Sequence, residues 1–383
     1  MERHARGSAL GVLCVCLIAC NIAAGNAPKT RTDSRGNVPL LGQTSRWYGS
    51  DEAVRVGGNV LLWQRDSGGW QKNVDMGGVL GTKAVAALKK AKSRTDSTLD
   101  NGATHTQIRF LARVYTACTK AGRAGERVEA IRAGCLKGID FLLKAQYANG
   151  GWPQFWPAAR GYSMHITFND GAMVGAMGVL RDVARERPEF AFVDAARRKK
   201  AASALAKGVG CILNCQIVVK GKRTAWCAQH DEKTLEPRKA RSYELPSISG
   251  SESVGVVRFL MGIDKPSPRI VESVQSAVAW FDQAKLTGIR LTTKKDPSMP
   301  RGFDRVVVKD PAAPPLWARF YRIGTNEPIF CSRDGIPRKT LAEISHERRT
   351  GYSWLGEYAA RLLTRDYPAW QKKWAPGRNV LKR

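Results

Sequence analysis

Apolar residues recur at helical spacing along most of this chain of 383 residues. The segments with this spacing cover residues 108–115, 131–142, 173–184, 194–217, 254–261, 270–286 and 353–364. Strand signals are confined chiefly to residues 289–293 and 305–308, which we expect to pair as a small β-hairpin. Helices joined by long loops rich in Gly, Pro and Asn predict a mainly α single domain. A ring of helix pairs would satisfy this pattern, but periodicity alone does not distinguish it from other all-α folds.

Two similar acidic motifs stand immediately before predicted helices. They are Asp100-Asn101-Gly102-Ala103 and Asn169-Asp170-Gly171-Ala172. Asp and Asn are preferred helix N-caps, worth about 1 kcal/mol, so capping alone would explain either motif. Their recurrence in two loops favours a second interpretation, because carboxylate and amide oxygens are the ligands that Ca²⁺ takes. No DxDxDG loop occurs, so an EF-hand is excluded and the ligands would come from separate loops.

Residues 226–244 form the most polar loop segment of the chain. Its cluster Arg238, Lys239 and Arg241 is either a solvated charge run or a site for anions. Arg319 and Arg333 lie in a second dense loop region. Guanidinium groups bind carboxylates through two parallel hydrogen bonds, so arginines spread over several loops suit a polyuronate.

The formal charge of +29 agrees with an anionic partner. Such a field attracts polyanions, although it also serves solubility alone. Nucleic acid is the weakest candidate, because the aromatic residues do not interleave with Lys and Arg as in known binding motifs. No HExxH, GxSxG or Gly-rich phosphate loop is present, so nucleophilic hydrolysis and nucleotide chemistry have little support.

The first 25 residues read as an export signal. Arg3 and Arg6 precede an apolar stretch, residues 9–19, that is too short to span a bilayer. Cleavage is expected near residues 23–27 or, in a lipoprotein leader that ends at Ala19, before a lipidated Cys20. We expect a secreted, periplasmic or lipid-anchored protein. Residues 26–45 are predicted to be a linker, 46–370 the folded domain and 371–383 a basic C-terminal tail.

Six cysteines lie beyond the leader, and no CxxC pair occurs, so a zinc cage is not expected. Some of the six would be able to pair in an exported chain, whereas Cys211 and Cys215, one helical turn apart, fit buried apolar positions. Trp152 and Trp156, in a Pro-containing stretch, are candidates either for the core or for stacking on sugar rings.

Several long runs of this sequence resemble the pectate lyases of polysaccharide lyase family ten. The resemblance covers roughly residues 45–365, in order. The matching runs are GGWQKNVDM (68–76), STLDNGATHTQIRFLARVY (97–115), NGGWPQFWP (149–157), GYSMHITFNDGAMV (161–174), WCAQHDEKTLEPRKARSYELPSISGSESVGVVRFLM (226–261), RFYRIGTNEPIFCSRDG (319–335) and RRTGYSWLGEYA (348–359). The resemblance implies an incomplete (α/α)3 toroid of helix pairs and Ca²⁺-dependent cleavage of polygalacturonate by β-elimination.

The resemblance also implies roles for individual residues. By motif position, Asp100, Asn101 and Asp170 would bind Ca²⁺, or the substrate carboxylate through it, and Arg241 would be the catalytic base. The residues expected to contact the substrate are Arg238, Lys239, Arg319, Arg333, Asn169 and Trp152.

An arginine base conflicts with the usual guanidinium pKa above about 12. We expect a crowd of cations, namely Ca²⁺, Arg238, Lys239 and the other arginines, to favour the neutral form and to give an alkaline optimum. The protein is expected to be a monomer. Two alternatives stay open: a lyase for another polyuronate, such as alginate or a glycosaminoglycan, and a non-catalytic protein that binds acidic polysaccharide.

Overall fold

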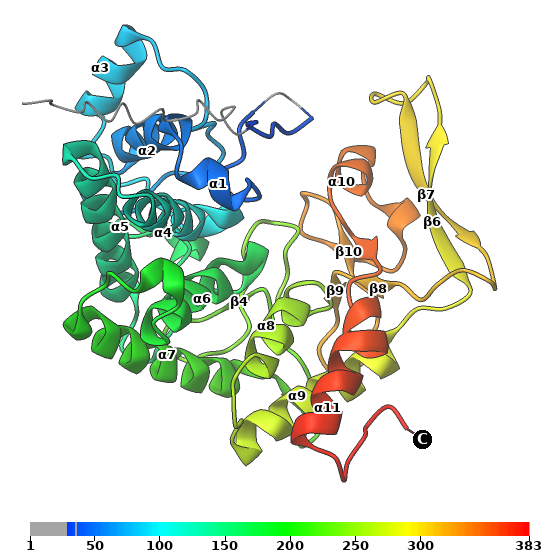
Figure 1. Ribbon diagram of the computed structural model, residues 1–383. Coiled ribbons are helices and arrows are strands. Elements are labelled where there is room, and N and C mark those ends of the chain that lie inside the picture. The colour runs from blue at the N-terminus through cyan, green and yellow to red at the C-terminus, as the bar shows by residue number, and fades with distance from the viewer. Residues whose placement is uncertain (1–28, 35–36, 383) are drawn as a thin grey trace, which may run out of the picture.

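The computed structural model describes residues 29–34 and 37–382, and it is mainly α-helical with little sheet (Figure 1). This confirms the predicted mainly α class. The α-helices are α1 (Ser45–Tyr48), α2 (Asp51–Trp63), α3 (Thr82–Lys90), α4 (His105–Lys120), α5 (Glu126–Ala145), α6 (Ala172–Ala184), α7 (Ala195–Cys215), α8 (Glu252–Met261), α9 (Pro268–Ala284), α10 (His346–Gly351) and α11 (Tyr367–Trp374).

The helices pack as pairs in two neighbouring rows. Helices α4, α6 and α8 contact one another in series, and α5, α7 and α9 form the second row. The members of each pair, α4 with α5, α6 with α7 and α8 with α9, also pack together. Short connections make each pair antiparallel. The N-termini of α4, α6 and α8 therefore share one end of the molecule, where the long loops gather.

The helices follow ordinary local signals. The side chains of Ser50, Asp194 and Ser267 cap α2, α7 and α9 by accepting from the third backbone N–H that follows. Glycine allows close approach at one crossing: a Cβ on Gly138 of α5 would lie only 2.6 Å from Ile108 of α4. The glycines in α5 therefore serve packing and do not break the helix.

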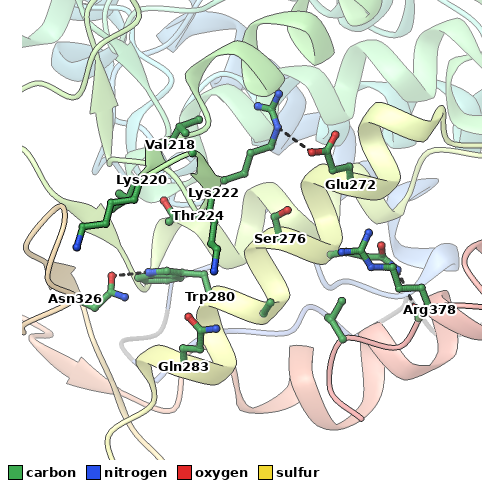
Figure 2. A pocket seen from close by; sticks show the side chains of 16 residues that line it. Val218, Lys220, Lys222, Thr224, Glu272, Ser276, Trp280, Gln283, Asn326 and Arg378 are labelled. Carbon is green, nitrogen blue, oxygen red and sulfur yellow. Dashed lines mark hydrogen bonds and ion pairs between the residues drawn. The ribbon is translucent and has the colours of Figure 1, made fainter. Parts of the chain in front are cut away.

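The predicted hairpin forms, as β6 (Ile289–Lys295) and β7 (Phe303–Lys309), which pair antiparallel with Ile289 opposite Lys309 and project from the body (Figure 1). Short strand pairs tie the loops together. They are β1 (Ile166–Thr167) with β4 (Gln229–His230), β5 (Ile248–Ser249) with β9 (Phe320–Tyr321), β8 (Trp317–Ala318) with β12 (Leu355–Gly356), and β10 (Phe330–Cys331) with β11 (Pro337–Arg338). A further hairpin, β2 (Val218–Val219) with β3 (Lys222–Arg223), lies beside α9 (Figure 2).

The last predicted helix begins later than expected. Residues 353–359 are not helical, because Leu355 and Gly356 pair with strand β8. The helical segment starts at Ala360, passes through a π-helical turn (Leu362–Asp366) and ends with α11. The apolar spacing in residues 353–364 therefore reflects the burial of Leu355, Ala359 and Leu362, and only the part from Ala360 onward is helical.

The predicted linker and tail pack against the domain where the structure describes them. The indole of Trp47 donates to Thr30 (2.8 Å), and Gln43 donates to the carbonyl of Arg31 (2.8 Å). In the tail, the carbonyl of Arg378 accepts from Gln275 of α9 (2.9 Å). The predicted leader, including Cys20, lies outside the described residues.

Tryptophans occupy the centre of the core. Trp152 is fully buried, and its indole N–H donates to the carbonyl of Leu142 (2.8 Å). The prediction that Trp152 stacks on sugar is therefore wrong, because its ring is enclosed beneath the loops and its one polar atom is already satisfied. The six cysteines beyond the leader are all unpaired and buried. No helix among the described residues is long and apolar enough to cross a membrane.

Candidate active site

The polar segment 226–244 owes part of its chemistry to folding. His230 is fully buried; it accepts from the backbone N–H of Cys227 (3.0 Å) and donates to the carbonyl of Leu235 (2.8 Å). Burial lowers the pKa of His230 to about 4, so the ring is neutral. His230 therefore holds the loop in shape and has no free nitrogen for catalysis.

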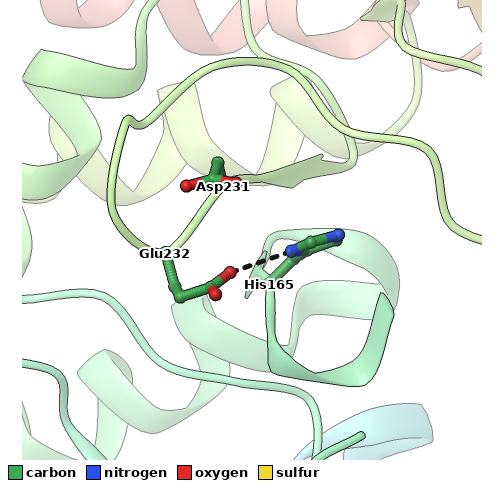
Figure 3. A group of neighbouring side chains, drawn as sticks. All are labelled: His165, Asp231 and Glu232. Atoms are coloured by element: carbon green, nitrogen blue, oxygen red, sulfur yellow. Dashed lines mark hydrogen bonds and ion pairs between the residues drawn. The ribbon is translucent and has the colours of Figure 1, made fainter. Parts of the chain in front are cut away.

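Beside it, His165, Asp231 and Glu232 bring potential metal-ligand atoms within 4.8 Å of one another (Figure 3). His165 Nδ1 lies 3.0 Å from Glu232 Oε2. The oxygens of Asp231 accept from the N–H groups of Thr234 and Lys233 and from Arg238, and these bonds hold its pKa well below the usual range. Asp231 therefore stabilises this loop through its hydrogen bonds, and the Arg238 guanidinium is paired with Asp231.

The two acidic motifs fold into the same backbone turn. Asp100–Gly102, the first turn, and Asn169–Gly171, the second turn, are each a single 3₁₀ turn. The middle residue is left-handed in both, with φ of 51° at Asn101 and 49° at Asp170. Asn and Asp tolerate this region better than other side chains, and Gly follows each of them. The turns contact each other, and the second turn also contacts α8.

Asp100 presents a buried carboxylate with one unsatisfied oxygen. The residue is 3% exposed, and its Oδ2 forms an ion pair with Lys72. Its Oδ1 is buried without a hydrogen-bond partner in the described chain. An unsatisfied buried acceptor is costly, so this atom suits a bound cation.

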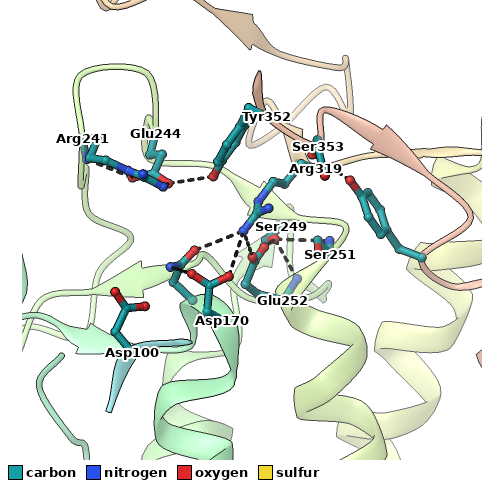
Figure 4. Close-up of polar contacts among 12 residues, drawn as sticks. Asp100, Asp170, Arg241, Glu244, Ser249, Ser251, Glu252, Arg319, Tyr352 and Ser353 are labelled. Carbon is teal, nitrogen blue, oxygen red and sulfur yellow. Dashed lines mark hydrogen bonds and ion pairs between the residues drawn. The ribbon is translucent and has the colours of Figure 1, made fainter. Parts of the chain in front are cut away.

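Asp170 faces the same place from the second turn (Figure 4). Burial raises the pKa of Asp170; the Arg319 guanidinium opposes this effect, whereas the negative charges of Glu252 and Asp100 add to it. Two carboxylates that repel each other, with amide oxygens on the same turns, form a set of hard oxygen donors. These residues fit Ca²⁺.

Arg319 joins the second turn to the start of α8. It is 9% exposed and donates to Asn169 Oδ1 (3.2 Å) and to Glu252, the first residue of α8; it also lies 3.6 Å from Asp170 Oδ1. Although burial acts in the opposite direction, Glu252 raises the pKa of Arg319. Its Nε is buried without a partner among the described residues, and its Nη1 makes no hydrogen bond to them, so Nη1 is the donor left to a ligand.

Arg241 lies across the site from the turns (Figure 4). Its guanidinium forms a two-point ion pair with the buried Glu244, with Nε 2.7 Å from Oε2. Tyr352 donates to the same carboxylate (2.7 Å). The Tyr352 ring also separates the two arginines, with its centre 5.5 Å from the Arg241 guanidinium carbon and 4.6 Å from that of Arg319.

The structure corrects the expected environment of the base. Hydrogen bonds to Glu244 raise the pKa of Arg241, and this effect outweighs burial. Arg238, expected to lower that pKa, is instead paired with Asp231. Among the described residues, Arg238 and Lys239 therefore do not supply the expected effect, since the strongest partner of Arg241 is the anion Glu244. The effect of Ca²⁺ on the pKa of Arg241 stays a prediction.

The remaining predicted residues lie at the rim. Arg333 is exposed, pairs with Glu347 (3.0 Å) and places its guanidinium carbon 5.7 Å from the centre of the Tyr243 ring. Arg241 lies 4.9 Å from the same ring centre, so Tyr243 contacts both arginines. Lys239 is exposed beside Gly335. The site thus gathers Asp100, Asp170, Asn169, Arg319 and Arg241 closely, while Trp152 and Arg238 are elsewhere engaged.

Four site residues escaped prediction: Lys72, Glu244, Glu252 and Tyr352. The pairing of Glu244 with Arg241 could have been predicted from the sequence, because the two residues are three positions apart and opposite charges at that spacing often pair. Glu252 carried a weaker signal as an acid at the start of an apolar helix, a position that the helix dipole favours. Lys72 and Tyr352 lie in two of the runs that resemble the family, but they reach the site through the packing of distant loops, and neither charge nor spacing marks them as site residues.

Comparisons with known proteins place this geometry in a family. The family model described as Pectic acid lyase matches residues 64–363. A family 10 polysaccharide lyase from Cellvibrio cellulosa is 34% identical in sequence, with a TM-score of 0.70, over 86% of this chain and 95% of that one. An Asp→Ala mutant of a family 10 polysaccharide lyase from Cellvibrio cellulosa, in complex with trigalacturonic acid, gives a TM-score of 0.71 at 34% identity, over 86% and 96%. No curated protein sequence matched. The chain belongs to the pectic acid lyase family and is a family 10 polysaccharide lyase.

Proposed function

We propose that this lyase cleaves α-1,4-polygalacturonate with the help of Ca²⁺ and releases 4,5-unsaturated oligogalacturonates. The observation that carries the proposal is the pair of facing turns, in which Asp100 keeps an unsatisfied oxygen and Asp170 a carboxylate of raised pKa. The trigalacturonate complex of the Cellvibrio relative supports the choice of substrate.

Asp100, Asn101 and Asp170 would hold the calcium ion. Bound calcium supplies Lewis-acid stabilisation of the negative charge that develops on a uronate carboxylate. Asn101 donates its own amide to Asn73 (3.0 Å), which orients the side chain at the rim of the first turn. Arg319, held by Asn169 and Glu252 through Nη2, would bind a neighbouring uronate carboxylate through Nη1, and Arg333 would do so from the rim.

Arg241 would act as the base. Its neutral guanidine takes the C5 proton, the C–H electrons form the C4–C5 double bond, and the C4–O bond breaks with its electron pair on the leaving oxygen, which then takes a proton from water. Glu244 favours the protonated guanidinium in the free enzyme. Activity should therefore rise with pH far into the alkaline range, because only the neutral fraction of Arg241 accepts a proton.

The test is the ultraviolet absorbance of the unsaturated product. We expect polygalacturonate to give a rise with Ca²⁺ and none with a chelator, and alginate to give none. Arg241→Lys should lose about 10²–10⁴-fold in kcat, the usual contribution of a general base. Arg198→Lys, at a surface arginine paired with Glu186, is the matched control and should retain full activity. Near-full activity of Arg241→Lys at moderate pH would contradict the assignment of the base.

Three further expectations belong to this proposal. The two rows of helices would form an incomplete (α/α)3 toroid, the protein would be a monomer, and residues 1–25 would direct export. Cleavage would occur either near residues 23–27 or before a lipidated Cys20. Mass spectrometry of the mature N-terminus distinguishes these two forms, and an intact Met1 in the exported host fraction would contradict both.

A further inference from the structure

A second hollow lies outside the active site, over one face of α9. Its volume is about 750 Å³, within the range of ligand-binding sites. We call it the α9 groove; it is bounded by the β2–β3 hairpin with Thr224, by the α9 residues Glu272, Ser276 and Gln283, by Asn326 and by Arg378 (Figure 2). None of the active-site residues described above is among the residues that line it.

Cationic side chains dominate the groove. Lys220, Lys222, Arg223 and Arg378 line it, with Glu272 as the one acid among the lining residues. Glu272 approaches Arg223 at 3.6 Å. Neither Lys220 nor Lys222 has an ion-pair partner among the described residues, and both are exposed. An unpaired charge is common on a flat surface, but two of them above a concave surface create a focused positive potential.

The hairpin fixes these charges in place. Val219 pairs with Lys222, so the connection is the two-residue turn Lys220-Gly221. Both turn residues have positive φ, 49° and 74°, which is the tight hairpin geometry that matches the twist of the strands. The two ammonium groups therefore start from a defined backbone at the rim of the groove, and less entropy is lost when they meet a ligand than for lysines on a mobile loop.

The floor offers neutral hydrogen-bonding groups. Asn326 accepts from the indole N–H of Trp280 (2.9 Å), which orients its amide. Ser276 and Gln283 project from the same face of α9. Trp280 itself is only 2% exposed, so stacking on a sugar ring is not available here. The groove therefore offers cations for an anionic group and neutral polar side chains for hydroxyl groups.

We propose that the α9 groove is a second, non-catalytic binding site for acidic polysaccharide. The ammonium groups of Lys220 and Lys222 would bind uronate carboxylates, and the polar floor would bind ring hydroxyls. The choice of a polyuronate rests on the proposed function of the enzyme. A polymer that occupies both the groove and the active site gains avidity, whereas a trisaccharide too short to occupy both does not.

Binding without cleavage is the first test. Electrophoresis through gels that contain polygalacturonate, with a chelator present, compares Lys220→Ala/Lys222→Ala with Lys89→Ala/Lys90→Ala. The control removes the same charge from exposed positions on α3. We expect the groove variant to bind about two- to thirtyfold more weakly than the control, as for the loss of two exposed ion pairs. Equal retardation of the two variants would overturn the proposal.

Kinetics and other polyanions complete the test. On polygalacturonate the groove variant should show a raised KM and an unchanged kcat, with both constants unchanged on trigalacturonate. An equal loss of retardation in gels containing dextran sulfate or DNA would mean general charge attraction and would also overturn the polyuronate assignment. If every variant including the wild type lacked lyase activity, the proposed function would fail, while the difference in retardation would still stand.

Discussion

The first and second turns have the same backbone conformation, but the Asp and the Asn occupy opposite positions in them. In the first turn the buried position holds Asp100 and the left-handed rim position holds Asn101. In the second turn the buried position holds Asn169 and the rim position holds Asp170. Each turn thus offers one carboxylate and one amide, but at opposite places.

The partners of the buried positions explain the exchange. Asp100 is buried next to Lys72, which compensates its charge. Asn169 is buried next to Arg319, and that arginine is already compensated by Glu252. A second buried carboxylate there would lie beside Glu252 without a cation of its own. In the proposed calcium site, the charge of Asp100 is thus compensated by Lys72, and we expect Asp170 to be the carboxylate that responds to a bound cation.

Removal of either carboxylate should have the largest effect. Asp100→Asn and Asp170→Asn should each lower lyase activity about 100-fold or more, because each removes a calcium ligand and with it several kcal/mol of transition-state stabilisation. Asp296→Asn, in the turn of the β6–β7 hairpin, is the control and should be neutral. A variant at either turn with more than about half of wild-type activity would break the proposed pairing.

An exchange within the second turn should affect folding next. The double change Asn169→Asp with Asp170→Asn gives this turn the arrangement of the first, so that a carboxylate is buried beside Glu252. We expect a loss of about 1–3 kcal/mol in the free energy of unfolding, the cost of a poorly compensated buried polar group. The single change Asp170→Asn should instead raise the free energy of unfolding without calcium, since it removes a carboxylate whose ionisation the fold disfavours. Urea denaturation distinguishes the two outcomes.

The pH dependence of calcium binding follows from Asp170. Burial raises its pKa, so the folded state without calcium gains stability from this group at low pH and loses it as the pH rises through the raised value. Calcium binds only the ionised carboxylate, so we expect the calcium affinity to increase as the pH rises. The calcium-induced rise in Tm should therefore be larger at pH 8 than near pH 4, and Asp170→Asn should reduce the difference. An equal rise at both pH values would exclude Asp170 as a ligand.

The smallest effect concerns the backbone alone. Asn101 has φ of 51°, a region that costs most residues about 1–2 kcal/mol. Asn101→Ala should therefore lower stability by about 1 kcal/mol, and Asn101→Gly should not. Both changes remove the amide, so a comparison of the two separates its role in calcium affinity from the strain of the turn. Equal stabilities would mean that the left-handed conformation carries no cost.

Sequence patterns predicted the elements whose formation depends mainly on residues close together in the chain. The helices, the β6–β7 hairpin and the repeated Asp/Asn turns follow from periodicity and from residues that favour caps and turns. The buried network around Arg319 could not be predicted in this way. Glu252 is 67 residues away from Arg319 along the chain, and the pairing of β5 with β9, with Ser249 opposite Phe320, brings the two residues together. The prediction that Trp152 binds sugar was wrong for a related reason. Its Gly and Pro neighbours predict a loop, but the rest of the fold covers this part of the loop and buries the ring.

Calcium titration into the wild type and Asp170→Asn, followed by calorimetry without substrate, tests the central claim most directly. The account predicts one calcium ion per wild-type chain and at least tenfold weaker binding in Asp170→Asn, with the control Asp296→Asn unchanged. Binding of equal strength in wild type and Asp170→Asn would contradict the claim that the two turns form one calcium site.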